Sequence, residues 1–374
     1  MCKDVGAMTG AIPTSRRRFL WLVGAGSLGA ALAACDGSTA PASSAPPASS
    51  SAAASTAAAS AKPAASGASA SAKPAASAGT ATLKVAYVTT GGTHAPLWVA
   101  KDGGAFEKFG VKVEDQFIEA SLGTKALIAK EVDVILQSAA PLITADLNGG
   151  AGIEFIGSVL NHSQFALLVA PSIKTASDLK GKAWATDKPG STGDYQTRLL
   201  LKLLGLTTND VVIRELGGND IPLQALLSGQ VQAAPMIPPF TFQGVAKGYP
   251  ILKDTYDQPY QNVGVIVPKS RVADSRQALV SFLAGYREGI RMYNSQPDMA
   301  MSVLKKYTKE TDDSLLKQTY DFYKTQAPFQ TDLQPTLPGI QNMLDFLSTT
   351  IPAAKDAKPE QFVDTSLLAE LPKS

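Results

Sequence analysis

A segment without core-forming side chains divides this chain of 374 residues into two very different parts. Between residues 36 and 80, every residue except Asp36, Lys62 and Lys73 is Ala, Ser, Thr, Gly or Pro. Such a segment has almost no apolar surface to bury, so it cannot offset the entropy lost when a chain becomes ordered. We therefore expect a disordered linker over residues 35–80 and a folded core that begins at residue 81.

A basic cluster followed by an apolar run precedes the linker. Arg16, Arg17 and Arg18 are adjacent, and residues 19–34 carry no charge. A basic region followed by a short apolar region is typical of a secretory signal peptide. Sixteen residues of helix span less than the roughly 30 Å hydrocarbon core of a bilayer, which favours a signal peptide over a permanent transmembrane helix. An uncleaved N-terminal anchor helix is the alternative.

Two short motifs in this region resemble bacterial export signals. Arg16 and Arg17, with Phe19 and Leu20 behind them, resemble the twin-arginine signal. The run Leu32-Ala33-Ala34-Cys35 resembles the lipobox, in which the cysteine is lipidated and becomes the first residue of the mature protein. The resemblance implies that residues 1–34 are a lipoprotein signal peptide. It also implies that Cys35 anchors the exported protein to the outer face of the bacterial cytoplasmic membrane, in the periplasm or at the cell surface.

The charge and residue content of the remaining chain exclude several classes of partner. Residues 1–35 hold four of the 34 basic and one of the 32 acidic residues, so 30 basic and 31 acidic residues remain. This near-neutral balance argues against nucleic acid as a partner. Residues 81–374 contain no cysteine, and His94 and His162 are their only histidines. We therefore expect no disulfide, no metal site and no cofactor.

Apolar runs of strand length alternate with helical segments from residue 81 onward. The first strand is expected over 83–88 and a helix over 96–101. Further strands are expected over 111–118, 132–136, 183–186, 211–216 and 233–237. Such alternation is typical of an α/β fold with mostly parallel sheets. Apolar residues spaced by three and four from Leu279 to Tyr293 predict one long amphipathic helix.

Two apolar runs that end in proline suggest how the domains are connected. These runs cover residues 166–172 and 263–270, and the roughly ninety residues between them contain strands and helices of their own. We interpret them as two strands that join two lobes, with lobe 1 formed by 81–170 and 263–374 and lobe 2 by 171–262. Two edge strands of a single large sheet are the alternative.

Several stretches resemble one family of binding proteins. Residues 95–114 resemble the first helix and second strand of ABC-importer substrate-binding proteins in the NMT1/THI5-like group, which handles nitrate, sulfonates, taurine and thiamine precursors. Residues 179–182 and 225–234 resemble motifs in the second lobe of that family, although Gln232 stands where the family usually has Asp. The resemblance implies a type II periplasmic-binding fold, whose two lobes close on a small molecule and present it to a permease with ATPase subunits. It also implies a monomer without catalytic residues.

The expected binding site lies where loops follow the carboxyl ends of parallel strands. Four loops qualify: residues 89–95, 137–141, 187–194 and 235–240. The candidate ligand-binding residues in and beside them are Gly92, Thr93, His94, Trp98, Gln137, Ser138, Ala139, Lys188, Gly190, Ser191, Thr192, Pro239 and Phe240. For Trp98 and Phe240, packing inside a lobe is the alternative role, and Trp184 is expected in the core. His94 is equally expected as a surface or capping residue.

The third loop carries most of the expected chemistry. Lys188 and Gly190 precede a helix start, where free backbone amides and the helix dipole favour an anion. Ser191 with Asp194 three residues later also fits a capping box, which would give Ser191 a structural role. From this loop we expect the ligand to be a small organic or inorganic anion: a sulfonate, nitrate, an aromatic carboxylate or a thiamine precursor.

Three classes of function fit the sequence to different degrees. An import receptor fits the export signals, the linker and the two lobes together. An enzyme on the same fold, such as a thiamine-pyrimidine synthase or a small-acid lyase, would need reactive groups that residues 81–374 largely lack. A surface lipoprotein without a transport role would not need a cleft between two lobes.

Overall fold

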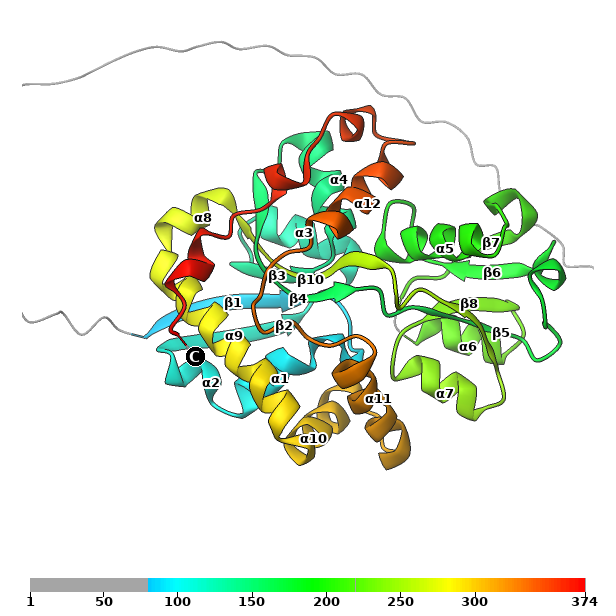
Figure 1. The fold of residues 1–374 in the computed structure, drawn as a ribbon, viewed down its shortest axis with the longest axis horizontal. Coiled ribbons are helices and arrows are strands. Elements are labelled where there is room, and N and C mark those ends of the chain that lie inside the picture. The colour runs from blue at the N-terminus through cyan, green and yellow to red at the C-terminus, as the bar shows by residue number, and fades with distance from the viewer. Residues whose placement is uncertain (1–79, 219, 374) are drawn as a thin grey trace, which may run out of the picture. The chain divides into compact units, whose positions relative to one another are not determined.

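The computed structural model describes residues 80–218 and 220–373. The expected signal peptide, the lipid anchor at Cys35 and the linker lie outside the described residues. The described chain forms two lobes, each built on a five-stranded sheet (Figure 1).

The first lobe has a sheet covered by helices on both faces (Figure 1). Its strands lie in the order β2 (Val111–Phe117), β1 (Ala81–Tyr87), β3 (Val134–Gln137), β10 (Pro259–Pro268) and β4 (Ile153–His162). One face packs on α1 (Ala95–Asp102), α2 (Ala105–Lys108), α9 (Arg276–Ser295), α10 (Pro297–Thr308) and α11 (Asp313–Thr325). The other face packs on α3 (Ala120–Ile128), α4 (Ala139–Gly149) and α12 (Leu337–Leu347). The short helix α8 (Lys269–Asp274) follows β10.

The second lobe is smaller and has the same layered form. Its strands lie in the order β7 (Val212–Glu215), β6 (Ala183–Thr186), β8 (Ala233–Met236), β5 (Ala166–Val169) and β9 (Ile251–Asp254). Its helices are α5 (Thr192–Leu203), α6 (Ile221–Leu227) and α7 (Phe240–Ala246). Trp184 on β6 is fully buried in the core of this lobe, as expected.

Both sheets mix parallel and antiparallel pairs, which differs from the expected mostly parallel arrangement. The pairs β1–β2, β1–β3, β6–β7 and β6–β8 are parallel. The strands next to the connections between the lobes pair antiparallel, because β10 runs against β3 and β4 while β5 runs against β8 and β9. The chain therefore leaves and re-enters the first lobe along neighbouring antiparallel strands.

Two short segments carry the chain between the lobes, and they lie beside each other (Figure 1). One joins β4 to β5 through residues 163–165, and the other joins β9 to β10 through residues 255–258. The hydroxyls of Ser163 and Thr255 lie 2.5 Å apart, and both are within hydrogen-bond distance of Oε1 of Gln196 on α5. The two connections are therefore held together at one point, as expected of a hinge.

The sheet membership shifts the expected lobe boundaries. Residues 166–169 were expected to end the first lobe, but as β5 they pair with β8 and β9 inside the second sheet. Residues 259–262, expected in the second lobe, belong to β10 of the first sheet. We therefore propose that the lobes meet at residues 163–165 and 255–258. Apolar composition alone did not show which sheet each run would join.

The long helix expected near residue 279 is present as α9, and its buried face contains Leu279, Phe282, Tyr286 and Tyr293. Within residues 80–218 and 220–373, no helix combines the length and apolar character needed to cross a membrane.

Candidate functional site

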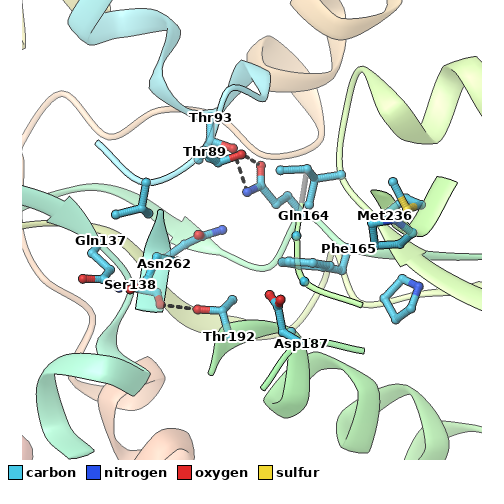
Figure 2. A pocket seen from close by; sticks show the side chains of 18 of the residues that line it. Thr89, Thr93, Gln137, Ser138, Gln164, Phe165, Asp187, Thr192, Met236 and Asn262 are labelled. Atoms are coloured by element: carbon cyan, nitrogen blue, oxygen red, sulfur yellow. Dashed lines mark hydrogen bonds between the residues drawn. The ribbon is translucent and has the colours of Figure 1, made fainter. Parts of the chain in front are cut away.

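A pocket of about 130 Å³ lies between the lobes, and residues of both lobes line it (Figure 2). The first lobe supplies the ends of β1 and β3 and the start of α3, and the second supplies the end of β6, the start of α5 and the end of β8. The first connection between the lobes supplies Gln164 and Phe165, and β10 supplies Asn262. One water molecule needs roughly 10–15 Å³ of this cavity volume. If each non-hydrogen atom of a ligand needs about as much, the pocket has room for on the order of ten of them.

The structure brings five of the expected binding residues to this pocket, and these are Thr93, His94, Gln137, Ser138 and Thr192. The other eight do not line it. These are Gly92, Trp98, Ala139, Lys188, Gly190, Ser191, Pro239 and Phe240. The four loops expected from strand order therefore do surround the pocket, but many of their side chains have other partners.

Thr93 is fixed in the pocket wall by a buried network of hydrogen bonds. Its Oγ1 donates to Oε1 of Gln164 at 3.0 Å and accepts from Nε2 of the same side chain at 2.8 Å. The Tyr323 hydroxyl from α11 also donates to Oε1 of Gln164. The network joins the loop after β1 to the first connection between the lobes, so it holds this wall rigid.

His94 is buried behind the same wall, where neither ring nitrogen has a hydrogen-bond partner among the described residues. Burial lowers the pKa of His94 to about 3, because a charged ring would lose its hydration without gaining a counter-ion. The ring is therefore neutral at physiological pH, and it contributes shape and one N–H group to the wall rather than charge.

Trp98 lies in the core of the first lobe and not at the pocket. Its ring stacks on Tyr307 with centroids 4.7 Å apart and meets the edge of Tyr87 at 5.6 Å. The side chain is fully buried, so it supports the loop after β1 from behind.

Gln137 and Ser138 close the pocket at the end of β3. Gln137 donates from Nε2 to the carbonyl of Ala120 at 2.9 Å and accepts from the Thr124 hydroxyl at 3.0 Å. Ser138 makes a short hydroxyl contact with Thr192 of α5, which connects the lobes across the pocket (Figure 2). Ala139 begins α4 in the core behind Ser138.

The loop expected to hold an anion is mostly occupied by its own contacts. Ser191 caps α5, since its Oγ accepts from the Asp194 amide at 3.2 Å. The Asp194 carboxylate accepts from the Gly190 amide at 2.9 Å and from Arg198 at 2.8 Å. Lys188 is exposed and does not line the pocket. The capping role considered for Ser191 is thus confirmed, and no lysine or arginine lines the pocket among the described residues.

An acidic side chain of the same loop does face the pocket. Figure 2 shows the Asp187 carboxylate at the end of β6 pointing into the pocket. Burial, and secondarily the nearby charge of Glu119, raise the pKa of Asp187 to about 6, although Lys188 acts in the opposite direction. Glu119 also lines the pocket. The charged residues in the described lining are therefore Asp187 and Glu119, and both are acidic. This charge does not favour the expected anion.

The loop after β8 packs inside the second lobe and against the first. Phe240 is buried among apolar side chains of α6 and β8, and Pro239 is the residue that precedes α7. Gly92 donates from its amide to the carbonyl of Pro238 at 3.2 Å, across the two lobes. A Cβ added at Gly92 would lie 2.7 Å from Cε2 of Tyr323, so this close approach requires glycine.

Sequence reasoning missed several residues that line the pocket. Gln164 and Phe165 come from the first connection between the lobes, and Asn262 comes from β10. Asp187, Gly193 and Gly218 lie near the start of α5. One signal was available for the connections: Gln164 and Asn262 are polar residues just before the apolar runs that mark β5 and β10. No cluster of three or more His, Cys, Asp or Glu side chains within the described chain fits a metal ion.

Several solved structures that this chain resembles are described as periplasmic binding proteins. The chain is similar to the periplasmic aliphatic sulphonate binding protein SsuA from Escherichia coli, with a TM-score of 0.62, 20% identity, and coverage of 76% of this chain and 92% of the other. For the periplasmic nitrate-binding protein NrtA from Synechocystis PCC 6803 the TM-score is 0.62 at 15% identity, over 78% of this chain and 88% of the other. For the alkanesulfonate-binding protein SsuA from Xanthomonas axonopodis pv. citri bound to MOPS it is 0.60 at 18% identity, over 78% and 97%. These likenesses confirm the expected type II periplasmic-binding fold.

Sequence comparison identifies the family. No curated protein matches the chain. The model of the family described as NMT1/THI5 like matches residues 92–300, which is more than half of the 374 residues. This match includes the pocket-lining residues from Thr93 to Val263 and the helix α9. The chain therefore belongs to the NMT1/THI5-like family.

Proposed function

We propose that this protein is the solute-binding component of an ABC importer and closes its two lobes on a small solute outside the cytoplasm. The observation that carries the proposal is the pocket itself. It lies between two lobes joined by two short connections, and both lobes and the first connection contribute to its lining. A site built in this way changes when the lobes move, so binding and lobe closure are coupled.

Contacts across the pocket support closure as the working motion. Ser138 and Gly92 of the first lobe contact Thr192 and Pro238 of the second. At another place along the cleft, the Gln243 amide on α7 donates to the Glu310 carboxylate at 2.7 Å. Aromatic contacts accompany these polar ones, since Tyr195 of α5 stacks on Tyr260 of β10 with ring centroids 5.1 Å apart. Lobe separation would therefore break a small number of polar and aromatic contacts at once.

Mass spectrometry of the gently purified protein tests this proposal. We expect the protein, purified without dialysis, to release on unfolding one small solute in near-stoichiometric amount. Small-angle X-ray scattering should show that the solute-free protein is more extended, and that adding the released solute restores the compact form. A protein that carries no solute, and whose scattering does not change on addition of a metabolite extract, would contradict a receptor role.

We also propose that Cys35 is lipidated and that Arg16 and Arg17 direct export, so that the binding domain works while tethered to the outer face of the cytoplasmic membrane. The support is the lipobox-like run before Cys35 and the basic cluster ahead of it. The Cys35→Ser variant should lose incorporation of labelled fatty acid and appear in the soluble fraction. If the wild-type protein takes up no lipid label, the proposed anchor is contradicted, while the proposal of solute binding is unaffected.

The partners that follow from this role are a permease and its ATPase subunits, with the receptor acting as a monomer. We propose no catalytic role. The only histidine in the pocket lining is His94, whose nitrogens are buried and whose ring is neutral, so it is poorly suited to proton transfer. Turnover of the released solute during prolonged incubation would favour an enzyme instead.

A further inference from the structure

The Asp187 carboxylate differs from the neighbouring carboxylates of its lobe. Asp178, Asp194 and Asp210 each accept a hydrogen bond from at least one backbone amide. Across residues 80–218 and 220–373, no group donates a hydrogen bond to the Asp187 carboxylate, although it is partly buried. A desolvated carboxylate without donors is unfavourable, so its position calls for a partner that the described residues do not supply.

Gly193 makes room for this carboxylate, and Gly218 lies beside it. A Cβ added at Gly193 would lie 2.8 Å from Oδ2 of Asp187, closer than real Cβ contacts allow. A Cβ at Gly218 would lie 3.6 Å from the same oxygen. Both glycines line the pocket. The backbone on two sides of Asp187 is therefore bare, and the carboxylate can face a ligand from between them.

The side chain of Asn262 offers a second hydrogen-bond acceptor in the lining of the pocket. Asn262 lies in the wall, and its Nδ2 donates to the carbonyl of His162 at 3.0 Å. The amide oxygen Oδ1 is then the end of this side chain that has no partner among the described residues. By contrast, the amide of Gln137 is used at both ends and Gln164 is held by Thr93 and Tyr323. The side-chain groups left for a ligand are mainly acceptors.

We propose that the pocket binds a small organic cation, an amine or amidine whose N–H groups donate to the Asp187 carboxylate. The proposal rests on the solute-binding function above and names the chemical class of its solute. Charge and hydrogen bonding agree, because the charged residues in the lining are acidic and both Asp187 and Asn262 offer an acceptor oxygen. The apolar remainder of the wall, which includes Phe165, Met236 and Ile237, suits the carbon part of such a solute.

Three compounds of one size and shape test the class directly. Benzamidine, benzamide and benzoate have the same planar framework, within the size that the pocket admits, and are cationic, neutral and anionic at pH 7.5. Calorimetric titration of each into the solute-free protein should give the tightest binding for benzamidine. We expect it to exceed benzamide by roughly ten- to a hundredfold, the effect of charge-assisted hydrogen bonds, and benzoate to bind weakest.

The Asp187→Asn variant tests whether this residue selects the charge. It should lose the preference for benzamidine over benzamide, while Asp274→Asn, which changes an exposed carboxylate on α8, should keep it. A thermal melt of each variant establishes that it is folded. Tightest binding of benzoate, failure of all three compounds to bind, or an unchanged preference in Asp187→Asn would overturn the cation proposal.

The solute released from purified protein separates this proposal from the receptor function. An anionic solute that restores the compact form overturns the cation class and leaves the receptor intact. A cationic solute whose affinity falls at least tenfold in Asp187→Asn supports both. Absence of any solute, together with failure of the three compounds, would remove both.

Discussion

The loops after β1 and β6 stand at equivalent places in the two lobes, but they differ in whether the described residues satisfy the hydrogen bonds of their polar side chains. In the first, Thr93 and His94 are buried, and Thr93 is held by Gln164 and Tyr323. In the second, Asp187 carries a charge toward the pocket without a donor among the described residues. The first lobe thus supplies a fixed wall, and the second supplies a group that gains from a ligand. Shape and charge selection are divided between the lobes.

The largest effect should come from breaking the fixed wall. Gln164→Ala removes the side chain that accepts from the buried hydroxyls of Thr93 and Tyr323. These hydroxyls lie 3.2 Å apart, so one can donate to the other and one buried donor is left unsatisfied. Because an unsatisfied buried donor costs about 1–3 kcal/mol, we expect the free energy of unfolding to fall by about 3 kcal/mol at pH 7. Urea unfolding measures it. As a control, Gln341→Ala removes an exposed glutamine that bonds only Asp345 and should change stability by less than about 0.5 kcal/mol. Equal effects of the two variants would contradict the rigid-wall role.

The charged loop should respond in the opposite direction. Asp187→Asn removes a charge that the folded state disfavours, so the solute-free protein should become more stable at pH 7, by about 1–3 kcal/mol. Asp178→Asn is the matched control, because hydrogen bonds from Lys174 and Thr175 lower the pKa of Asp178. That variant should lose stability. A destabilised Asp187→Asn would mean that the carboxylate has a structural partner after all.

Lowering the pH separates the two loops further, because Asp187 and His94 change the stability of the folded state in opposite directions. The pKa of Asp187 is raised to about 6, so as pH falls from 7 to 4 the folded state takes up a proton before the unfolded state, and stability rises. The pKa of His94 is lowered to about 3, so below pH 6.5 only the unfolded state takes up a proton, and stability falls.

Differences in unfolding free energy between variants and wild type isolate the two groups. The advantage of Asp187→Asn over wild type should shrink as pH falls from 7 to 4. The stability of His94→Leu relative to wild type should instead increase over the same range, by up to about 1.4 kcal/mol per pH unit. Denaturant titrations at half-unit pH intervals measure both slopes. Slopes of the same sign would refute the assignment of opposite protonation behaviour to the two loops.

Sequence reasoning located the α/β fold, the two lobes and the loops around the pocket, because these follow from apolar periodicity and strand order. β6 was expected over 183–186 and lies there, and α9 follows the apolar spacing from Leu279 to Tyr293. The run over 166–169 was placed in the wrong sheet, since a buried apolar strand carries no mark of its neighbours.

The side chains of the site were harder to predict than its loops. The loop after β6 was expected to act through Lys188, but Asp187 faces the pocket, because successive side chains at a strand end point in opposite directions. The amides expected to bind an anion are partly used, since Ser191 and Asp194 cap the helix start. Gln164 and Asn262 could not be predicted as site residues, because only the folded chain brings the first connection and β10 together beside the pocket.

The smallest effect should come from removing the contact between Ser138 of the first lobe and Thr192 of the second. Ser138→Ala removes the hydroxyl contact with Thr192 but leaves the stack of Tyr195 on Tyr260 at 5.1 Å. One hydrogen bond between neutral groups is worth about 0.5–1.5 kcal/mol, so the ratio of closed to open protein should fall roughly two- to tenfold. Fluorescent probes at the exposed positions 112 and 202, one in each lobe, should report lower energy transfer in the solute-free variant.

Ser348→Ala is the control, because its hydroxyl bonds only the carbonyl of Asp345 within the first lobe. Identical energy transfer in wild type and both variants would show that the Tyr195–Tyr260 stack and the Gln243–Glu310 contact hold the lobes together without Ser138. The charge at Asp187 would then select the solute in a cleft that is already closed.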